Sequence, residues 1–237
     1  MNHKSLLLAA CLSFALVPPA MAQTVTGSGV IPATASNSAE RAIGFAASAP
    51  ASGALVIAMT DAALPPLDGI ALGAAERQAV TAAIAAATFD GKAGSTLSLR
   101  GIGTYSRILL VGTGATPTSL ALAEAGGKAA QELKSEAQPV TIAGAFGDAS
   151  AADVAYGFAL GQYRFDRYKT VEKKAPPSGA VTVVGANPAA AEAAFNGRWK
   201  PLVDGVRLSR DLANEPANII YPESFVARVR EAFSGTA

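Results

Sequence analysis

The sequence predicts an α/β protein in which strands alternate with helices around one sheet. Four short runs, at residues 54–58, 107–111, 140–143 and 181–184, are continuously apolar and rich in β-branched residues. Such runs are typical of strands covered on both faces of a sheet. Amphipathic segments separate them, which is the alternation expected when helices pack on both faces.

The helices are expected at residues 74–87, 118–134 and 150–166, where apolar side chains recur at helical spacing. Residues 43–45 and 96–99 are weaker strand candidates, which we expect at the edges of the sheet. Residues 23–40 are rich in small and polar residues and read as a flexible leader, with a short strand near Val30 and Ile31.

A different pattern follows the last strand. Asn187 and Pro188 suit the N-cap and the first position of a helix, and an apolar stripe then continues toward residue 212. Gly197 and Pro201 interrupt the stripe, so we expect a kink or a restart at Pro201. Since no strand follows, this stretch is interpreted as a connector leading away from a finished sheet.

The first residues have the pattern of a secretory signal peptide. Lys4 precedes an apolar run at residues 6–17, and Ala20-Met21-Ala22 forms a small-residue cleavage site. The run is shorter than the ~20 residues that span a bilayer. The pattern predicts cleavage after residue 22, export to the periplasm or the medium, and no membrane attachment afterwards.

Removing residues 1–22 would leave a chain without histidine or cysteine, because the only ones are His3 and Cys11. Without Lys4, the 19 basic residues become 18 and balance the 18 acidic ones. This composition excludes disulfides, zinc sites with His or Cys ligands, and Ser-His-Asp or cysteine hydrolases. It also gives no basic excess that would indicate nucleic acid as a partner.

The turn Gly112-Thr113-Gly114 lies between a predicted strand and a predicted helix. Its backbone N–H groups can in principle hold a phosphate. The alternative, which we favour, is a tight turn that needs glycine for its backbone angles. The third glycine of a dinucleotide fingerprint is missing, because Thr116 and Pro117 follow.

Among the charged residues, Asp148 and Asp153 are the candidates for metal ligands near a helix start. We favour a cap for Asp148 and a solvated first-turn position for Asp153. The lysines at 169, 173 and 174 are interpreted as a solvated loop.

Two longer stretches are more distinctive, at residues 161–170 and 210–225. In the second, Pro216 biases Glu215 out of the helical region, and Pro222 starts the next helix. Asn214 and Asn218 carry short amides suited to fixing turn backbone. By itself this pattern indicates a helix–turn–helix joint.

These stretches resemble the leucyl (cytosol) aminopeptidase family. Residues 210–225 match the pattern R-D-L-x-N-x-P-x-N-x-x-x-P-x-x-F found where its two domains join. Residues 163–170 resemble the end of the last long helix of the family's N-terminal domain, and residues 110–127 its central strand, turn and helix. The resemblance extends from about residue 41 to the end of the sequence.

The resemblance implies a macro-domain-like mixed sheet with helices on both faces, then a connector helix and the start of a second domain. Family members are metallo-exopeptidases, often hexameric, that remove N-terminal residues from peptides. They use two divalent ions, zinc or manganese, held by Asp, Glu and Lys side chains of the C-terminal domain. No catalytic, cofactor-binding or metal-binding residue is therefore assigned in this sequence, and we expect this chain alone to be inactive.

The expected organisation is a signal peptide (1–22), a leader (23–40), an N-terminal α/β domain (41–186), a connector helix (187–213) and the truncated start of a catalytic domain (214–237). Two other functions stay open. A free-standing macro-domain-like module would bind a nucleotide or an ADP-ribose-type ligand at the Gly112–Gly114 turn. An interaction partner would dock on full-length family members.

Overall fold

The computed structural model describes residues 37–144, 146–169 and 179–235. Six strands form one sheet in the order β1-β6-β5-β2-β4-β3. All neighbouring strands are parallel except β3, which runs antiparallel to β4 at one edge. The strands are β1 (Ile43–Ala46), β2 (Ala54–Met59), β3 (Thr96–Leu99), β4 (Arg107–Gly112), β5 (Val140–Gly144) and β6 (Val181–Val184).

The predicted α/β class is confirmed, and the two weaker strand candidates occupy the two edges of the sheet. The strand expected near Val30 and Ile31 lies outside the described residues. The helical elements are α1 (Ala74–Ala86), α2 (Ser119–Glu132), α3 (Asp148–Gly161), α4 (Pro188–Ala194), the π-helical turn η1 (Phe195–Trp199), α5 (Lys200–Asn214) and α6 (Pro222–Ala232).

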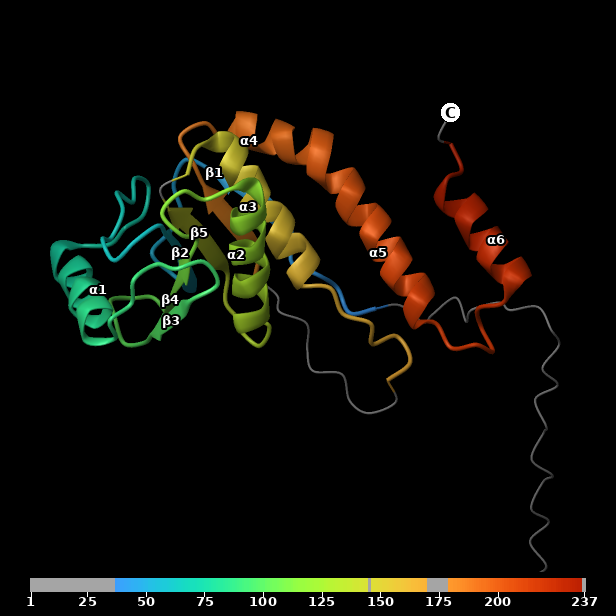
Figure 1. Cartoon of the computed structure of the whole chain (residues 1–237), viewed down its shortest axis with the longest axis horizontal. Coiled ribbons are helices and arrows are strands. Elements are labelled where there is room, and N and C mark those ends of the chain that lie inside the picture. The colour runs from blue at the N-terminus through green and yellow to red at the C-terminus, as the bar shows by residue number, and fades with distance from the viewer. Residues whose placement is uncertain (1–36, 145, 170–178, 236–237) are drawn as a thin grey trace, which may run out of the picture.

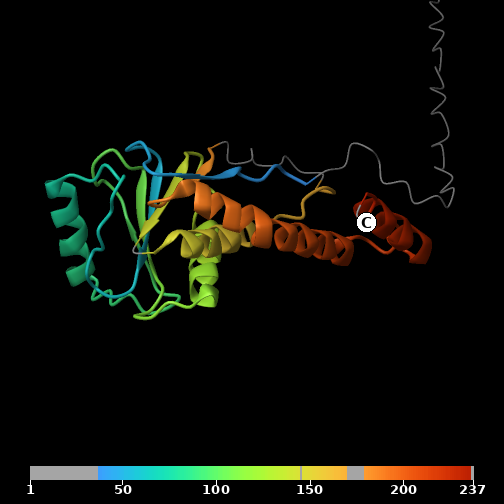
Figure 2. The same ribbon diagram turned by 90° about the horizontal axis from the view of Figure 1, so that it is seen from above.

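Helices cover both faces of the sheet, with α1 on one side and α2 and α3 on the other (Figures 1 and 2). All six residues of β2 are buried, as expected for a central strand between two helical layers. One apolar core lies beneath α2 and α3, and a second lies beneath α1 with Leu67, Ile70 and Leu72. Within the described residues, no helix combines the length and apolar character needed to cross a bilayer.

The helices α2 and α3 pack with their backbones unusually close together. An added Cβ at Gly126 would lie 2.0 Å from the Val154 carbonyl oxygen, and one at Gly157 would lie 1.7 Å from that of Ala123. Glycine is therefore required at this crossing, because any side chain would separate the helices.

The helix α3 ends at Gly161, five residues earlier than the sequence predicted. The following segment is held by side chains instead, since Asp166 accepts hydrogen bonds from the Ser38 N–H (2.7 Å) and the Ser38 hydroxyl (2.5 Å). These contacts cross more than 120 residues of sequence, so helical periodicity gave no sign of them.

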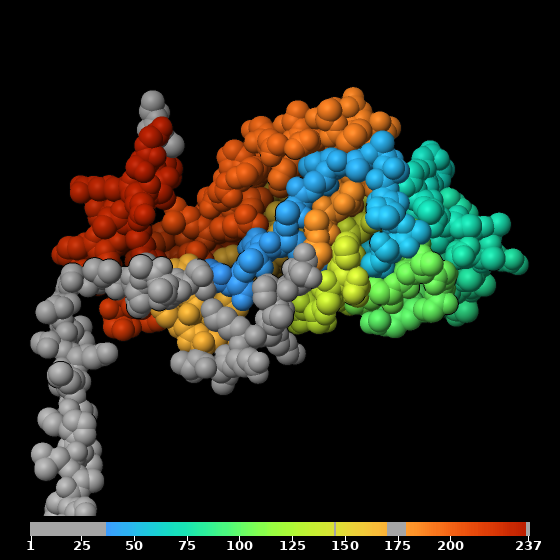
Figure 3. Space-filling model, turned by 180° about the vertical axis from the view of Figure 1, so that it is seen from behind, coloured from blue at the N-terminus to red at the C-terminus, as the bar shows by residue number. Residues whose placement is uncertain are grey.

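The connector begins as predicted, with Asn187 capping α4 through a 3.1 Å hydrogen bond from the Ala190 N–H. The kink or restart expected at Pro201 takes the form of a restart, because the π-helical turn η1 follows α4 and α5 begins at Lys200. Pro201 lies in the first turn of α5, where its missing N–H costs little. Beyond the sheet, α5 runs away from the body and α6 lies past its end (Figures 1 and 3).

The close crossing of α2 and α3 yields a stability prediction. Gly157→Ala is expected to lower the free energy of unfolding by about 1–3 kcal/mol or more, because the new methyl group meets the Ala123 carbonyl. Urea unfolding followed through Trp199 fluorescence measures this change.

Gly205→Ala in α5 is the matched control, since its added Cβ would meet nothing within 4 Å. It is expected to stabilise the protein by about 0.5–1 kcal/mol through helix propensity. Equal effects of the two substitutions would contradict the close-crossing argument.

Candidate functional site at the joint between α5 and α6

The two distinctive stretches of the sequence meet around the carboxylate of Glu215, whose side chain is 0% exposed. It accepts hydrogen bonds from Arg167 Nη1 (2.8 Å), Arg228 Nη1 (2.8 Å) and the Tyr168 hydroxyl (2.5 Å). A buried carboxylate needs such partners to stay charged. Glu215 therefore joins the segment after α3, the end of α5 and the middle of α6.

A second carboxylate, Asp211, lies one helical turn before Glu215. It accepts hydrogen bonds from Arg167 Nη2 (2.7 Å), the Tyr163 hydroxyl (2.7 Å) and Asn37 Nδ2 (3.0 Å). Arg167 thus holds both carboxylates with separate guanidinium nitrogens. We call this set the joint cluster; it consists of Asn37, Tyr163, Arg167, Tyr168, Asp211, Glu215 and Arg228.

The local sequence explains why Glu215 faces inward. Pro216 prevents a helical conformation at Glu215, whose backbone is extended at φ −68° and ψ 137°. The next helix, α6, begins at Pro222, and Ser224 Oγ accepts a 2.9 Å hydrogen bond from the Tyr221 N–H. The predicted joint is therefore present, with the stop and the start at the expected prolines.

Three groups of the joint cluster, Glu215, Tyr163 and Tyr168, have shifted pKa values. Burial alone would raise the pKa of Glu215. Hydrogen bonds from Tyr168 and Arg228, with the charges of Arg228 and Arg167, outweigh burial and hold that pKa below 4.5. Burial and the hydrogen bond to Asp211 raise the pKa of Tyr163 to about 12, and similar causes raise the pKa of Tyr168. Both tyrosines therefore keep their hydroxyl hydrogens at neutral pH and donate them to Asp211 and Glu215, and the cluster acts as a clamp.

The Gly112–Gly114 turn has no N–H groups left for a phosphate. The Gly112 N–H donates to Ser95 O (2.9 Å), the Thr113 N–H to Met59 O (2.8 Å) and the Gly114 N–H to Gly91 O (2.9 Å). Gly114 has a φ of +80°, which accounts for glycine there. The geometry thus supports a structural turn and gives no support to a nucleotide site.

Asp148 and Asp153, the candidate ligands for which we favoured other roles, both lie in α3. The predicted cap role of Asp148 is wrong, because Gly147 is the N-cap and Asp148 lies in the first turn; its carboxylate instead accepts a 2.9 Å hydrogen bond from the Asn187 N–H. Asp153 is only 7% exposed, so its predicted solvated position is wrong. The reason is that α3 packs against α2 and also against α4 and η1, so most of its side chains are buried.

No group of three or more His, Cys, Asp and Glu side chains among the described residues is arranged to hold a metal ion. Of the loop lysines, Lys169 is exposed, whereas residues 173 and 174 lie outside the described residues.

Sequence reasoning missed the contact between the two motif stretches and the role of Asn37. Complementary charge could have indicated this contact, because Arg167 lies in one stretch and Asp211 and Glu215 lie in the other. It also missed Arg41, which is only 6% exposed and donates to the carbonyl oxygens of Gln138 (2.8 Å) and Gly179 (2.7 Å).

Comparison with known proteins identifies relatives of this chain. The sequence model described as the N-terminal domain of the cytosol aminopeptidase family matches residues 56–172. A probable cytosol aminopeptidase from Rhodopseudomonas palustris is 38% identical over 185 residues, covering 69% of this chain and 36% of the relative. One from Caulobacter vibrioides is 37% identical over 184 residues, covering 74% of this chain and 36% of the relative. The chain thus spans about a third of the length of these relatives.

Solved structures show the same fold. A tomato leucine aminopeptidase mutant superposes with a TM-score of 0.68 at 24% identity, covering 84% of this chain and 44% of that chain. The bottromycin maturation enzyme BotP gives a TM-score of 0.53 at 22% identity, covering 78% of this chain and 37% of that chain.

The relatives contradict the predicted export to the periplasm or the medium, because they are named cytosol aminopeptidases. The expected signal peptide lies outside the described residues. In a chain that is 50% hydrophobic, a short apolar run beside Lys4 and an Ala-x-Ala triplet is a weak signal. With Cys11 retained, a single cysteine still cannot form an intramolecular disulfide.

The resemblance seen in the sequence is therefore confirmed by the domain match, by the identity to the relatives and by the fold. This chain belongs to the cytosol (leucyl) aminopeptidase family, of which it carries the N-terminal domain.

Proposed function

We propose that this chain is the N-terminal, non-catalytic portion of a leucyl-aminopeptidase-like metallo-exopeptidase that removes N-terminal residues from peptides. The main support is the family match over residues 56–172, in a chain that spans about a third of the relatives' length. We propose domain boundaries at residues 41–186 for the α/β domain, 187–213 for the connector and 214–237 for the start of the next domain.

For the complete protein we propose two divalent metal ions, peptide substrates and a homo-oligomeric, hexameric assembly. One relative by fold, BotP, is known in a complex with Mn. The described side chains of this chain do not fit such a centre, because no suitable group of ligands is brought together. This part of the protein has a structural role.

That structural role is to fix the direction in which the chain leaves α5. None of the described residues of α6 is buried, so packing contributes little to its position. The ion pair between Arg228 of α6 and Glu215 is the strong link, and Arg167 and Tyr168 connect Glu215 to the α/β domain. A segment that follows α6 would therefore start from a defined orientation.

The first prediction from the proposed role concerns activity. The purified chain, mixed with a leucyl anilide and Mn²⁺ or Zn²⁺, is expected to show no turnover above the metal alone, because it lacks a metal-holding cluster among its described residues. The Rhodopseudomonas palustris relative is the positive control. Metal-dependent release of the anilide by this chain would contradict the proposed non-catalytic role.

The second prediction concerns the joint cluster. Glu215→Gln keeps the shape of the side chain but removes the charge that pairs with Arg167 and Arg228. It is expected to lower the free energy of unfolding by about 3 kcal/mol, as for the loss of one partner in a buried pair. Trypsin cleavage after Arg228 and Arg230 should also accelerate, because α6 loses its anchor.

The matched control is Asp204→Asn in α5, whose exposed pair with Lys200 (2.7 Å) contributes about 0.5 kcal/mol or less. It should leave both unfolding and cleavage nearly unchanged. If Asp204→Asn and Glu215→Gln change the free energy of unfolding and the cleavage rate equally, Glu215 does not anchor α6.

The third prediction concerns pH. Because the pKa of Glu215 is lower in the folded state than its ordinary value of 4.5, its stabilisation is complete above that pH. It is lost as the pH falls below 4.5 through the folded-state pKa. Urea unfolding between pH 6 and 3 should therefore show a smaller loss of stability in Glu215→Gln than in the parent protein. An unchanged pH slope would refute the charged state assigned to Glu215.

A further inference from the structure

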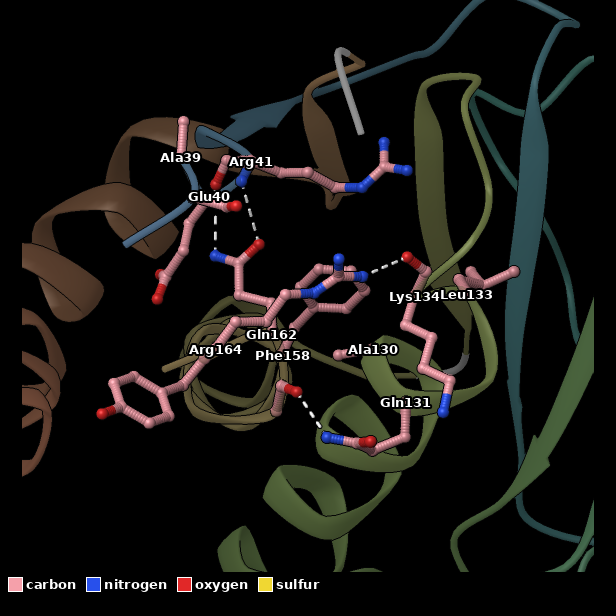
Figure 4. A pocket seen from close by; sticks show the side chains of 13 residues that line it. Ala39, Glu40, Arg41, Ala130, Gln131, Leu133, Lys134, Phe158, Gln162 and Arg164 are labelled. Carbon is pink, nitrogen blue, oxygen red and sulfur yellow. Dashed lines mark hydrogen bonds between the residues drawn. The ribbon is translucent and has the colours of Figure 1, made fainter. Parts of the chain in front are cut away.

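A small pocket lies where the residues before β1, the end of α2 and the segment after α3 come together (Figure 4). Its volume is about 100 Å³. Phe158 and Leu133 form its apolar base, and Arg41, Lys134, Arg164 and Gln131 supply polar groups around it. The joint cluster does not use these cationic groups.

The charges around the pocket are unbalanced. Three cationic side chains, Arg41, Lys134 and Arg164, line it, and none of them forms an ion pair with an Asp or Glu of the described residues. The carboxylate that lines it, Glu40, is already paired with Arg207 of α5. The pocket therefore carries an excess of positive charge.

Backbone carbonyl groups hold the two guanidinium groups in place without neutralising them. Arg41 donates through Nη1 to the carbonyls of Gln138 and Gly179 and through Nη2 to that of Glu136, and Arg164 Nη2 donates to the carbonyl of Lys134. Figure 4 shows both guanidinium groups on the side of Gln162 that faces Lys134. Burial lowers the pKa of Arg41; Glu136 opposes this effect, and the charge of Arg164 lowers the pKa further. An anion placed between the two guanidinium groups would relieve their mutual repulsion.

We propose that this pocket binds a small divalent oxyanion of the phosphate class. Arginine pairs well with phosphate oxygens because its donors form a planar fork, and positions fixed in advance lower the cost of binding. The volume suits an ion of this size and is far below the roughly 300–1,000 Å³ of pockets for drug-sized ligands, so a whole nucleotide does not fit. The site is independent of the proposed peptidase role.

The test uses the full chain and inorganic phosphate as the probe. At constant ionic strength set with sodium chloride, about 20 mM phosphate should raise the Tm by roughly 3–6 °C, which corresponds to a Kd near 1 mM. Arg164→Ala should reduce the rise to about a third or less, because it removes the more accessible guanidinium group and weakens binding at least about tenfold. Arg230→Ala, which removes an exposed cation of α6 outside the pocket, should keep it.

Titration calorimetry gives a second readout that does not depend on unfolding. The parent protein and Arg230→Ala should bind phosphate with similar Kd, and Arg164→Ala should bind at least about tenfold more weakly. The proposal is overturned if phosphate has no more effect than chloride, if acetate at the same ionic strength acts equally, or if Arg164→Ala retains the parent Kd.

Discussion

The buried carboxylate of Glu215 is the interaction on which the arrangement of the chain beyond the sheet depends. A carboxylate with a side chain 0% exposed is costly unless several donors surround it, and here two arginines and a tyrosine do so. The donors come from the α/β domain and from α6, whereas Glu215 lies at the end of α5. Because all of these segments must meet for the charge to be satisfied, the cluster specifies one arrangement of them.

The α/β domain supplies the rigid side of this arrangement. Its central strands are buried between two helical layers, and α2 and α3 approach so closely that glycine is needed at their crossing. Because the segment that carries Arg167 and Tyr168 follows α3 directly, the packing of α3 sets where those two side chains lie. The packing of α3 on the sheet therefore also determines the geometry of the joint cluster.

Much of the fold follows from local pattern. The four central strands were predictable because continuous burial makes them apolar throughout, and the prolines at 216 and 222 marked the joint because proline constrains the backbone in any context. The antiparallel direction of β3 follows from its short connection to β4, because parallel neighbours need a longer crossover. The burial of Asp153 was not predictable, since it depends on helices distant in sequence. The same applies to the joint cluster, in which Arg167 and Glu215 are 48 residues apart. At the N-terminus, local sequence was misleading rather than silent. The pattern of a signal peptide suggested export, which the relatives contradict.

The central claim is that Glu215 holds α6 in one orientation relative to the α/β domain. Spin labels at the exposed positions of Lys128→Cys in α2 and Ala227→Cys in α6, in a chain carrying Cys11→Ser, allow this distance distribution to be measured by double electron–electron resonance. The account predicts one narrow distribution that broadens markedly when Glu215→Gln is added. A distribution that is already broad with Glu215 present, or one that stays narrow without its charge, would contradict it.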